Sequence, residues 1–241
     1  MRYFRKPQIN VEIICRNSGL TMCESLLSYT ELIKQLPYKR MCYDKTRMTT
    51  WDSFKEDKVF GPFFHNVFNT RETVKFSREE LFTIVNTTEF SNAIFSIVLW
   101  GYPRGYTMGM NMKKLFQKLI DNLPILKDEI WVNRNFTRDE FNNCFNKIIF
   151  EDTGIGVSTL TKFLYFFKIK IEGYRCLILD SRIISVIKDC NFSELRSLNI
   201  YKDAELYIEY VKKGDEISKT NDYEIDQLEM FLFMFGNNLK L

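Results

Sequence analysis

The residues best suited to chemistry lie in two short segments of the second half of the chain. Residues 154–162 read GIGVSTLTK and end at Lys162, and residues 177–182 read LILDSR and contain Asp180. A neutral lysine is a nucleophile, and an ionised carboxylate stabilises positive charge that develops on a reacting atom. Nucleophilic and electrostatic catalysis are therefore the chemistries that this sequence favours.

Other common catalytic groups are scarce. The chain has one histidine, His65, which we expect to be structural or at the surface, so a Ser-His-Asp triad or an imidazole-rich metal site would depend on that residue alone. The six cysteines form no CxxC pair, and we expect free thiols with neither a zinc site nor an iron–sulfur cluster. They are Cys15, Cys23, Cys42, Cys144, Cys176 and Cys190.

The glycine triplet Gly154-Ile155-Gly156 predicts a tight turn between two helices. A helix is expected over 137–150 and another over 157–167, so that residues 137–167 form a helix-hairpin-helix. The glycines allow positive φ angles, Ile155 anchors the turn in the core, and the amides of residues 154–158 would bind a phosphate oxygen of a nucleic-acid backbone. A plain helical hairpin, with glycines that only end the helix, is the alternative.

Asp180 follows an apolar run, residues 176–179, and precedes residues at helical spacing. It is therefore predicted to be an N-cap, which would stabilise the helix by about 1 kcal/mol. A carboxylate held by helix-start amides stays ionised, so capping and catalysis are compatible roles.

The elements that must position these residues are mainly helical. Ser77 with Glu80, and Thr137 with Glu140, have the spacing of capping boxes and so mark two helix starts. Helical periodicity also covers residues 26–36, 93–99, 112–123, 204–211 and 225–235. The polar stretch 212–222 is interpreted as a loop, the aromatic helix 225–235 as core without a functional role, and a little β structure is allowed near the N-terminus.

Composition sets the outer bounds. The chain has 241 residues, 45% of them hydrophobic, and a formal net charge of +3, which neither requires nor excludes a polyanionic partner. It has no apolar run close to the roughly 20 residues that span a bilayer, and residues 1–10 lack the apolar middle of a signal peptide. We expect a cytoplasmic protein with no membrane partner.

The hairpin and the aspartate together resemble the helix-hairpin-helix DNA glycosylase superfamily, and specifically its 8-oxoguanine glycosylase-like branch. The resemblance covers residues 135–190, and the segment VLWGYPRG, residues 98–105, is also similar to bacterial proteins of this type. It implies a single glycosylase-like domain over 1–241 with two helical lobes. It also implies that the hairpin binds the lesion strand, that the damaged nucleotide is flipped out, and that Asp180 is catalytic.

The sequence departs from the family at the nucleophile. In bifunctional members a lysine lies two residues after the second hairpin glycine, where this chain has Ser158. Lys162 lies one helical turn later on the same face, as in the similar archaeal 8-oxoguanine glycosylases. Burial among Phe163, Tyr165, Phe166 and Phe167 would lower its pKa, whereas the alternative is an ordinary solvated or phosphate-contacting lysine.

The resemblance implies a DNA N-glycosylase that excises a flipped, damaged or modified purine such as 8-oxoguanine, with AP-lyase activity if Lys162 forms a Schiff base. Arg182 is a candidate for phosphate binding, with an ordinary surface arginine as the alternative. Trp100, Tyr102 and Arg104 are candidates for base stacking, although a core tryptophan beside the turn at Gly101 and Pro103 is the favoured interpretation of Trp100. The basic residues Lys113, Lys114 and Lys118 either contact a phosphate backbone or form a solvated face. No cofactor is expected beyond a monovalent cation at the hairpin.

The alternative function is that of a catalytically altered nucleic-acid or nucleotide-binding accessory protein of a bacterial anti-phage defence system, with other defence proteins as partners.

Overall fold

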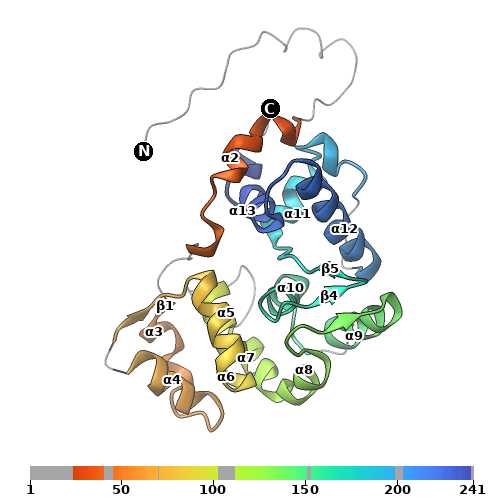
Figure 1. Ribbon diagram of the computed structural model, residues 1–241. Coiled ribbons are helices and arrows are strands. Elements are labelled where there is room, and N and C mark those ends of the chain that lie inside the picture. The colour runs from red at the N-terminus through yellow and green to blue at the C-terminus, as the bar shows by residue number, and fades with distance from the viewer. Residues whose placement is uncertain are drawn as a thin grey trace.

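The computed structural model describes residues 24–40, 46–69, 71–102, 112–150, 153–198 and 203–239. Within these ranges the protein is mainly helical, as predicted, with two small sheets. Figure 1 shows helix α10 near the centre, with α5 and α6 on one side and the C-terminal helices on the other.

The elements of the first half are mostly helices. They are η1 (Leu26–Tyr29), α2 (Thr30–Lys34), η2 (Tyr38–Arg40), α3 (Met48–Trp51), η3 (Asp52–Phe54), α4 (Phe60–Phe68), α5 (Arg78–Thr87), α6 (Phe90–Gly101), α7 (Met112–Asp121) and α8 (Leu123–Glu129). Strands β1 (Thr46–Arg47) and β2 (Thr73–Val74) pair in an antiparallel manner. The β structure allowed near the N-terminus is therefore present as a single two-residue strand pair within the described part of the chain.

The second half carries five helices in its described residues, among them the 17-residue α12. They are α9 (Arg138–Phe150), α10 (Val157–Phe166), α11 (Ser181–Lys188), α12 (Ala204–Thr220) and α13 (Ile225–Phe235), with the turns η4 (Ser193–Leu195) and η5 (Gly236–Asn238). The periodicity of residues 225–235 predicted α13 at both ends, and that of residues 157–167 predicted α10 to within one residue.

Both predicted capping boxes are confirmed. The amide of Ser77 donates to the Glu80 carboxylate at 2.6 Å, and the Glu80 amide donates back to the Ser77 hydroxyl at 3.2 Å. The same reciprocal pair joins Thr137 and Glu140, at 2.8 and 3.4 Å. Each pair satisfies backbone donors that a helix start leaves without partners, and so fixes where α5 and α9 begin.

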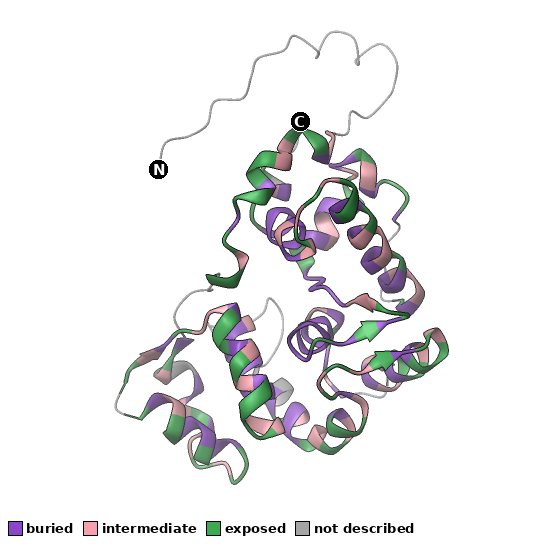
Figure 2. Cartoon of the chain, in the orientation of Figure 1, coloured by how far each residue is buried: buried purple, intermediate pink, exposed green. Residues whose placement is uncertain are grey.

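Helices α6 and α10 form the centre of the core. Every residue from Ala93 to Trp100 is buried in α6, and α10 buries all of its residues except Ser158 (Figure 2). Rings line this contact: Trp100 meets Phe166 edge to face with centroids 5.1 Å apart. Helix α10 is thus surrounded by protein, and any of its side chains that is polar must find its partners inside the fold.

A second sheet, of three strands, was not predicted from the sequence. Strand β3 (Asn135–Phe136) is parallel to β4 (Lys170–Ile171), and β4 is antiparallel to β5 (Tyr174–Arg175). The turn between β4 and β5 has positive φ at Glu172 (51°) and Gly173 (86°), as a two-residue hairpin requires. Strands of two residues carry no alternation of side chains that a sequence pattern could reveal.

The prediction of a loop over residues 212–222 is wrong, because α12 continues to Thr220. The polar residues form ion pairs along the helix, Lys213 with Glu216 at 2.9 Å and Lys219 with Asp215 at 2.6 Å. Gly214 lies where α12 contacts the core closely, since a Cβ there would be 2.9 Å from Leu177 Cδ1. This glycine reflects packing and does not end the helix.

The first described residues dock on the C-terminal helices. The amide of Glu24 donates to the Asn191 carbonyl at 3.0 Å, and the Ser193 amide donates to the Glu24 carbonyl at 2.9 Å. Helix α2 lies beside α13 in Figure 1. In the part of the chain that the structure describes, no helix is both long and apolar enough to cross a membrane.

Candidate active site

The hairpin between α9 and α10 is built on one buried threonine. The Thr153 hydroxyl donates to the Ile148 carbonyl and accepts from the Ile155 amide at 3.2 Å. Ile155 is buried beneath the turn. Gly154 has a φ of 74°, a left-handed conformation that favours glycine, whereas Gly156 has an ordinary φ of −86° as N-cap of α10. The expectation of positive φ at both glycines is therefore wrong for Gly156.

The start of α10 presents free backbone donors. The amides of Thr159 and Leu160 both donate to the Gly156 carbonyl, at 2.9 and 3.0 Å. Within the described residues, the amides of Gly156, Val157 and Ser158 have no hydrogen-bond acceptor, and no side chain caps this helix. Gly156 is exposed, and a Cβ built on it would meet nothing within 4 Å. Amide donors at a helix N-terminus, with open space in front of them, can bind an anion.

Lys162 lies one turn further along α10 and is only 4% exposed. Its Nζ donates to the Ser158 hydroxyl at 2.7 Å and to the Ser158 carbonyl at 3.0 Å, so the amine occupies the neighbourhood of the residue that replaces the usual lysine. Burial lowers the pKa of Lys162 from its ordinary value to about 8, against the opposing effect of the Asp180 carboxylate. A substantial fraction of this amine is therefore neutral near pH 8.

Asp180 is held at the start of α11 by a loop that other helices fix in place. The Leu179 amide donates to the Thr161 hydroxyl of α10 at 3.0 Å, and the Tyr207 hydroxyl of α12 donates to the Leu177 carbonyl at 2.7 Å. Asp180 Oδ1 then accepts from the amides of Arg182 and Ile183, both at 3.0 Å. The predicted N-cap is confirmed, and the carboxylate is 8% exposed.

Tyr102, at the C-terminal end of α6, completes the group around Lys162. Its hydroxyl is 2.6 Å from the Thr159 hydroxyl, and its ring centroid is 5.6 Å from Lys162 Nζ. Burial and the Asp180 carboxylate both raise the pKa of Tyr102, so it stays a neutral phenol. The structure therefore brings together Tyr102, Lys162 and Asp180 from three separate elements.

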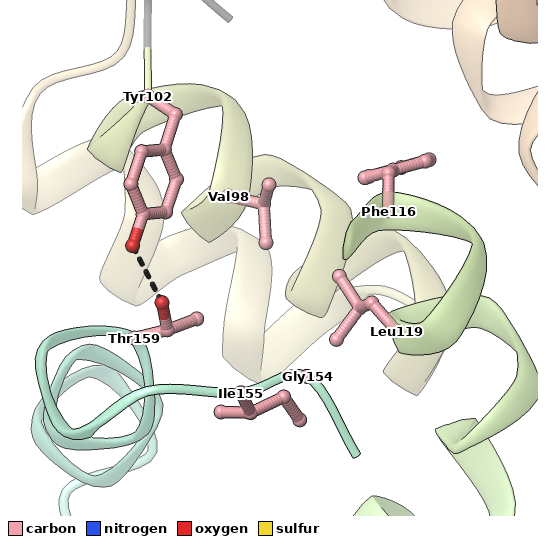
Figure 3. A pocket seen from close by; sticks show the side chains of 7 residues that line it. All are labelled: Val98, Tyr102, Phe116, Leu119, Gly154, Ile155 and Thr159. Atoms are coloured by element: carbon pink, nitrogen blue, oxygen red, sulfur yellow. Dashed lines mark hydrogen bonds between the residues drawn. The ribbon is translucent and has the colours of Figure 1, made fainter. Parts of the chain in front are cut away.

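A small apolar pocket lies against this group. Figure 3 shows that Tyr102 and Thr159 meet over one side of it, with the hairpin residues below and α7 opposite. Its lining residues are Val98, Tyr102, Phe116, Leu119, Gly154, Ile155 and Thr159. The pocket joins the hairpin to α6, the two elements that carry the predicted DNA-binding and stacking residues.

The remaining predicted residues lie apart from Lys162 or outside the described ranges. Trp100 is 2% exposed and packs on Phe166, so in this conformation its ring offers no face to a base. Arg182 is exposed in the first turn of α11, with its guanidinium 4.8 Å from the Phe233 centroid. Arg104 lies outside the described residues.

A buried ionic network behind the site was missed by the sequence analysis. Arg78 of α5 pairs with Glu229 of α13 at 2.6 Å, and both side chains are at most 1% exposed. Asp226 of α13 accepts from the Tyr165 hydroxyl and pairs with Arg175 at 2.8 Å. The available signal was the pair of acids three residues apart in the mostly apolar helix 225–235, since carboxylates on a core helix need partners.

The network is electrically linked to the lysine. Burial raises the pKa of Glu229 to about 7, against the lowering effect of Arg78, and the charges of Glu229 and Arg78 act on Lys162 in opposite directions. The network contains two guanidinium groups and two carboxyl groups. Burial accounts for the low pKa of Lys162: the charges of Asp180 and Glu229 oppose it, and only the smaller effect of Arg78 acts in the same direction.

In the ranges that the structure covers, no group of three His, Cys, Asp or Glu side chains is placed to hold a metal ion. The described cysteines Cys144, Cys176 and Cys190 are free thiols. Burial raises the pKa of Cys144 and of Cys176 to about 12, so both stay protonated and inert.

Comparison with known proteins places this arrangement in a family. No match was found among curated proteins or among solved structures. Residues 44–233, which include the hairpin, Lys162, Asp180 and the ionic network, match the family described as "Putative 8-oxoguanine DNA glycosylase OGG-like protein". The chain therefore belongs to this 8-oxoguanine DNA glycosylase OGG-like family.

Proposed function

We propose that this protein is a DNA N-glycosylase that excises a flipped oxidised purine, 8-oxoguanine or a close relative, with Lys162 as nucleophile. The observation that carries the proposal is the Lys162 amine, buried, with a pKa of about 8, and within the electrostatic influence of Asp180. An interior lysine without a role is rare, because burial penalises its charge. Family membership supports the same activity.

The reaction begins at the sugar of the flipped nucleotide. The neutral amine of Lys162 attacks the anomeric carbon, the bond from that carbon to the base breaks, and its electron pair leaves with the base, which takes up a proton. Positive charge develops on the sugar as the base departs, and the ionised Asp180 carboxylate stabilises it. The nitrogen loses a proton, and its lone pair then forms a double bond to the anomeric carbon as the bond from that carbon to the ring oxygen breaks. The ring oxygen takes up a proton, and a protonated imine links Lys162 to the DNA.

The imine has two outcomes. Hydrolysis returns the free lysine and an abasic site, whereas loss of the proton next to the imine carbon eliminates the 3′ phosphate and cuts the strand. The second outcome is the AP-lyase activity. Ser158 supports the nucleophile in either case, because its hydroxyl and carbonyl both accept from Lys162 Nζ.

The hairpin supplies the DNA contact in this proposal. The amides of Gly156, Val157 and Ser158 lie at the N-terminus of α10, and the space beside Gly156 is open. This arrangement suits a phosphate oxygen of the lesion strand. Such contacts position the strand without identifying its sequence. Recognition of the damaged base then falls to the site around Tyr102 and Lys162.

The test is base release from duplex oligonucleotides, each with one lesion, 8-oxoguanine first among them. We expect release by the wild-type protein and by Lys127→Ala, which removes an exposed lysine of α8. We expect none from Asp180→Asn, with DNA binding retained, and at least a hundredfold slower release from Lys162→Ala. Tight binding with no release from any lesion would overturn the proposal and favour the accessory binding protein.

A further inference from the structure

The stem of Lys162 runs across the last residue of α6. A Cβ built on Gly101 would be 3.0 Å from Lys162 Cδ and 3.1 Å from Cε. These distances are tighter than ordinary van der Waals contact between carbon atoms. The absence of a side chain at Gly101 therefore creates the space that the lysine stem fills.

Backbone geometry gives no other reason for this glycine. Glycines near helix ends commonly adopt a left-handed conformation, but among the described residues only Gly154 and Gly173 are glycines with positive φ. Gly101 is itself the last residue of α6. An alanine would normally favour the helix, so close packing against Lys162 is the physical account of the glycine.

The next residue covers the other end of the same side chain. The Tyr102 ring lies over Lys162 Nζ, with 5.6 Å from the nitrogen to the ring centroid, and the Tyr102 hydroxyl is fixed by Thr159 at 2.6 Å. Thr159 lies on α10, one residue after Ser158, the acceptor for Lys162. Tyr102 therefore bridges α6 to the same turn of α10 that holds the amine.

We infer that Gly101 and Tyr102 are positioning residues for Lys162: Gly101 leaves room for its stem, and Tyr102, latched by Thr159, covers its amine until a substrate displaces the ring. The inference rests on the proposed role of Lys162. In the resting protein the site is closed, and one contact must break before a substrate can reach the amine. A flipped sugar reaches the amine only after the bond between Tyr102 and Thr159 opens.

The first test is a thermal-unfolding cycle that needs no DNA. Gly101→Ala should lower the melting temperature of the wild-type protein, although alanine is the better helix former. In a Lys162→Ala background the same substitution should be neutral or stabilising, because the atoms it meets are gone. Equal destabilisation in both backgrounds would overturn the role of Gly101. Failure of the single variant to fold, with rescue in the double variant, would support it.

The second test measures access to the amine directly. Acetic anhydride acetylates neutral amines with loss of acetate, and peptide mass spectrometry reports the extent at Lys162 and, as an internal reference, at the exposed Lys127. Tyr102→Phe, which removes only the hydroxyl of the latch, should increase labelling of Lys162 severalfold relative to Lys127. Tyr223→Phe, which alters another partly buried tyrosine, should leave that ratio unchanged.

The pH profile of labelling separates positioning from general loosening. The groups that act on Lys162 are Asp180, Glu229 of α13 and Arg78 of α5, and none of them changes in Tyr102→Ala. Removal of the ring admits water, so the midpoint of Lys162 labelling should move from about 8 toward the ordinary 10.5. An unchanged midpoint and unchanged labelling in both Tyr102 variants would overturn the inference, even if base release had been demonstrated.

Discussion

At the scale of single residues, the site holds a lysine where the fold would be more stable without a charge. The pKa of Lys162 is about 8 in the folded protein and near 10.5 in an unfolded chain. Between these pH values the unfolded state binds more protons, so the contribution of Lys162 to stability rises with pH. Below about pH 8 the buried, charged lysine lowers the free energy of unfolding by its full amount, on the order of 3 kcal/mol.

Lys162→Met should therefore be more stable than the wild type at pH 7, because methionine fills the same space without a charge. The advantage should shrink as the pH rises from 8 past 10.5, because the wild-type lysine becomes neutral first in the folded state and then in the unfolded state. Urea unfolding at a series of pH values measures the difference. Lys127→Met, at an exposed position, is the control and should show no such trend. A stability difference independent of pH would show that the amine is not buried as described.

Asp180 caps α11 and has a proposed catalytic role, and different substitutions separate the two. Asparagine caps a helix nearly as well as aspartate, so Asp180→Asn should change the free energy of unfolding by only a few tenths of a kcal/mol. Asp180→Ala should cost about 1 kcal/mol, because the amides of Arg182 and Ile183 lose their acceptor. Both should abolish base release. If Asp180→Asn kept its activity, capping would be the only role of this residue.

At the scale of elements, the two hairpin glycines have different physical reasons. Gly154 has a φ of 74°, so Gly154→Ala should destabilise the protein by about 1 kcal/mol or more. Gly156 has an ordinary φ and open space around it, so Gly156→Ala should fold with little change. Its methyl group would instead stand before the free amides of α10.

Gly156→Ala should accordingly weaken binding to a duplex that contains an abasic-site analogue by several-fold, as measured by fluorescence anisotropy at fixed salt. Unchanged affinity in a folded Gly156→Ala variant would remove the start of α10 from the DNA interface.

The ion pair between α5 and α13 joins elements far apart in the chain. Glu229→Ala would leave the Arg78 guanidinium buried without its carboxylate, and should cost about 3–5 kcal/mol in unfolding free energy. The double variant Arg78→Met with Glu229→Leu should recover most of that loss. Glu216→Ala, which breaks the exposed pair with Lys213, should cost less than about 1 kcal/mol. Equal losses in the two single variants would contradict the buried network.

At the scale of the whole molecule, the sequence predicted what local patterns determine. Capping boxes located α5 and α9, the glycine triplet located the hairpin, and the apolar run before Asp180 located an N-cap, because each depends on residues a few positions apart. The ionic network and the contact of Gly101 with Lys162 join residues more than fifty positions apart. No local pattern reports such contacts.

The error over residues 212–222 has a different origin. Charged and small residues suit a solvent-facing helix as well as a loop, and only the packing of Gly214 against Leu177 and Ile225 decides between them. Trp100 was a candidate for stacking with a core position as the favoured alternative, and tertiary packing confirms the core position by burying the ring. Local patterns located the N-cap at Asp180 and the hairpin turn, whereas which side chains are buried follows only from the fold.

The central claim is that Lys162 is the nucleophile, and borohydride trapping tests it most directly. An 8-oxoguanine duplex incubated with the protein and sodium borohydride should give a covalent adduct, because the hydride reduces the imine to a stable amine. Peptide mapping should locate the adduct at Lys162, with none formed by Lys162→Ala and normal yield from Lys127→Ala. An adduct mapped to a different residue, or base release without any adduct and undiminished in Lys162→Ala, would contradict the account.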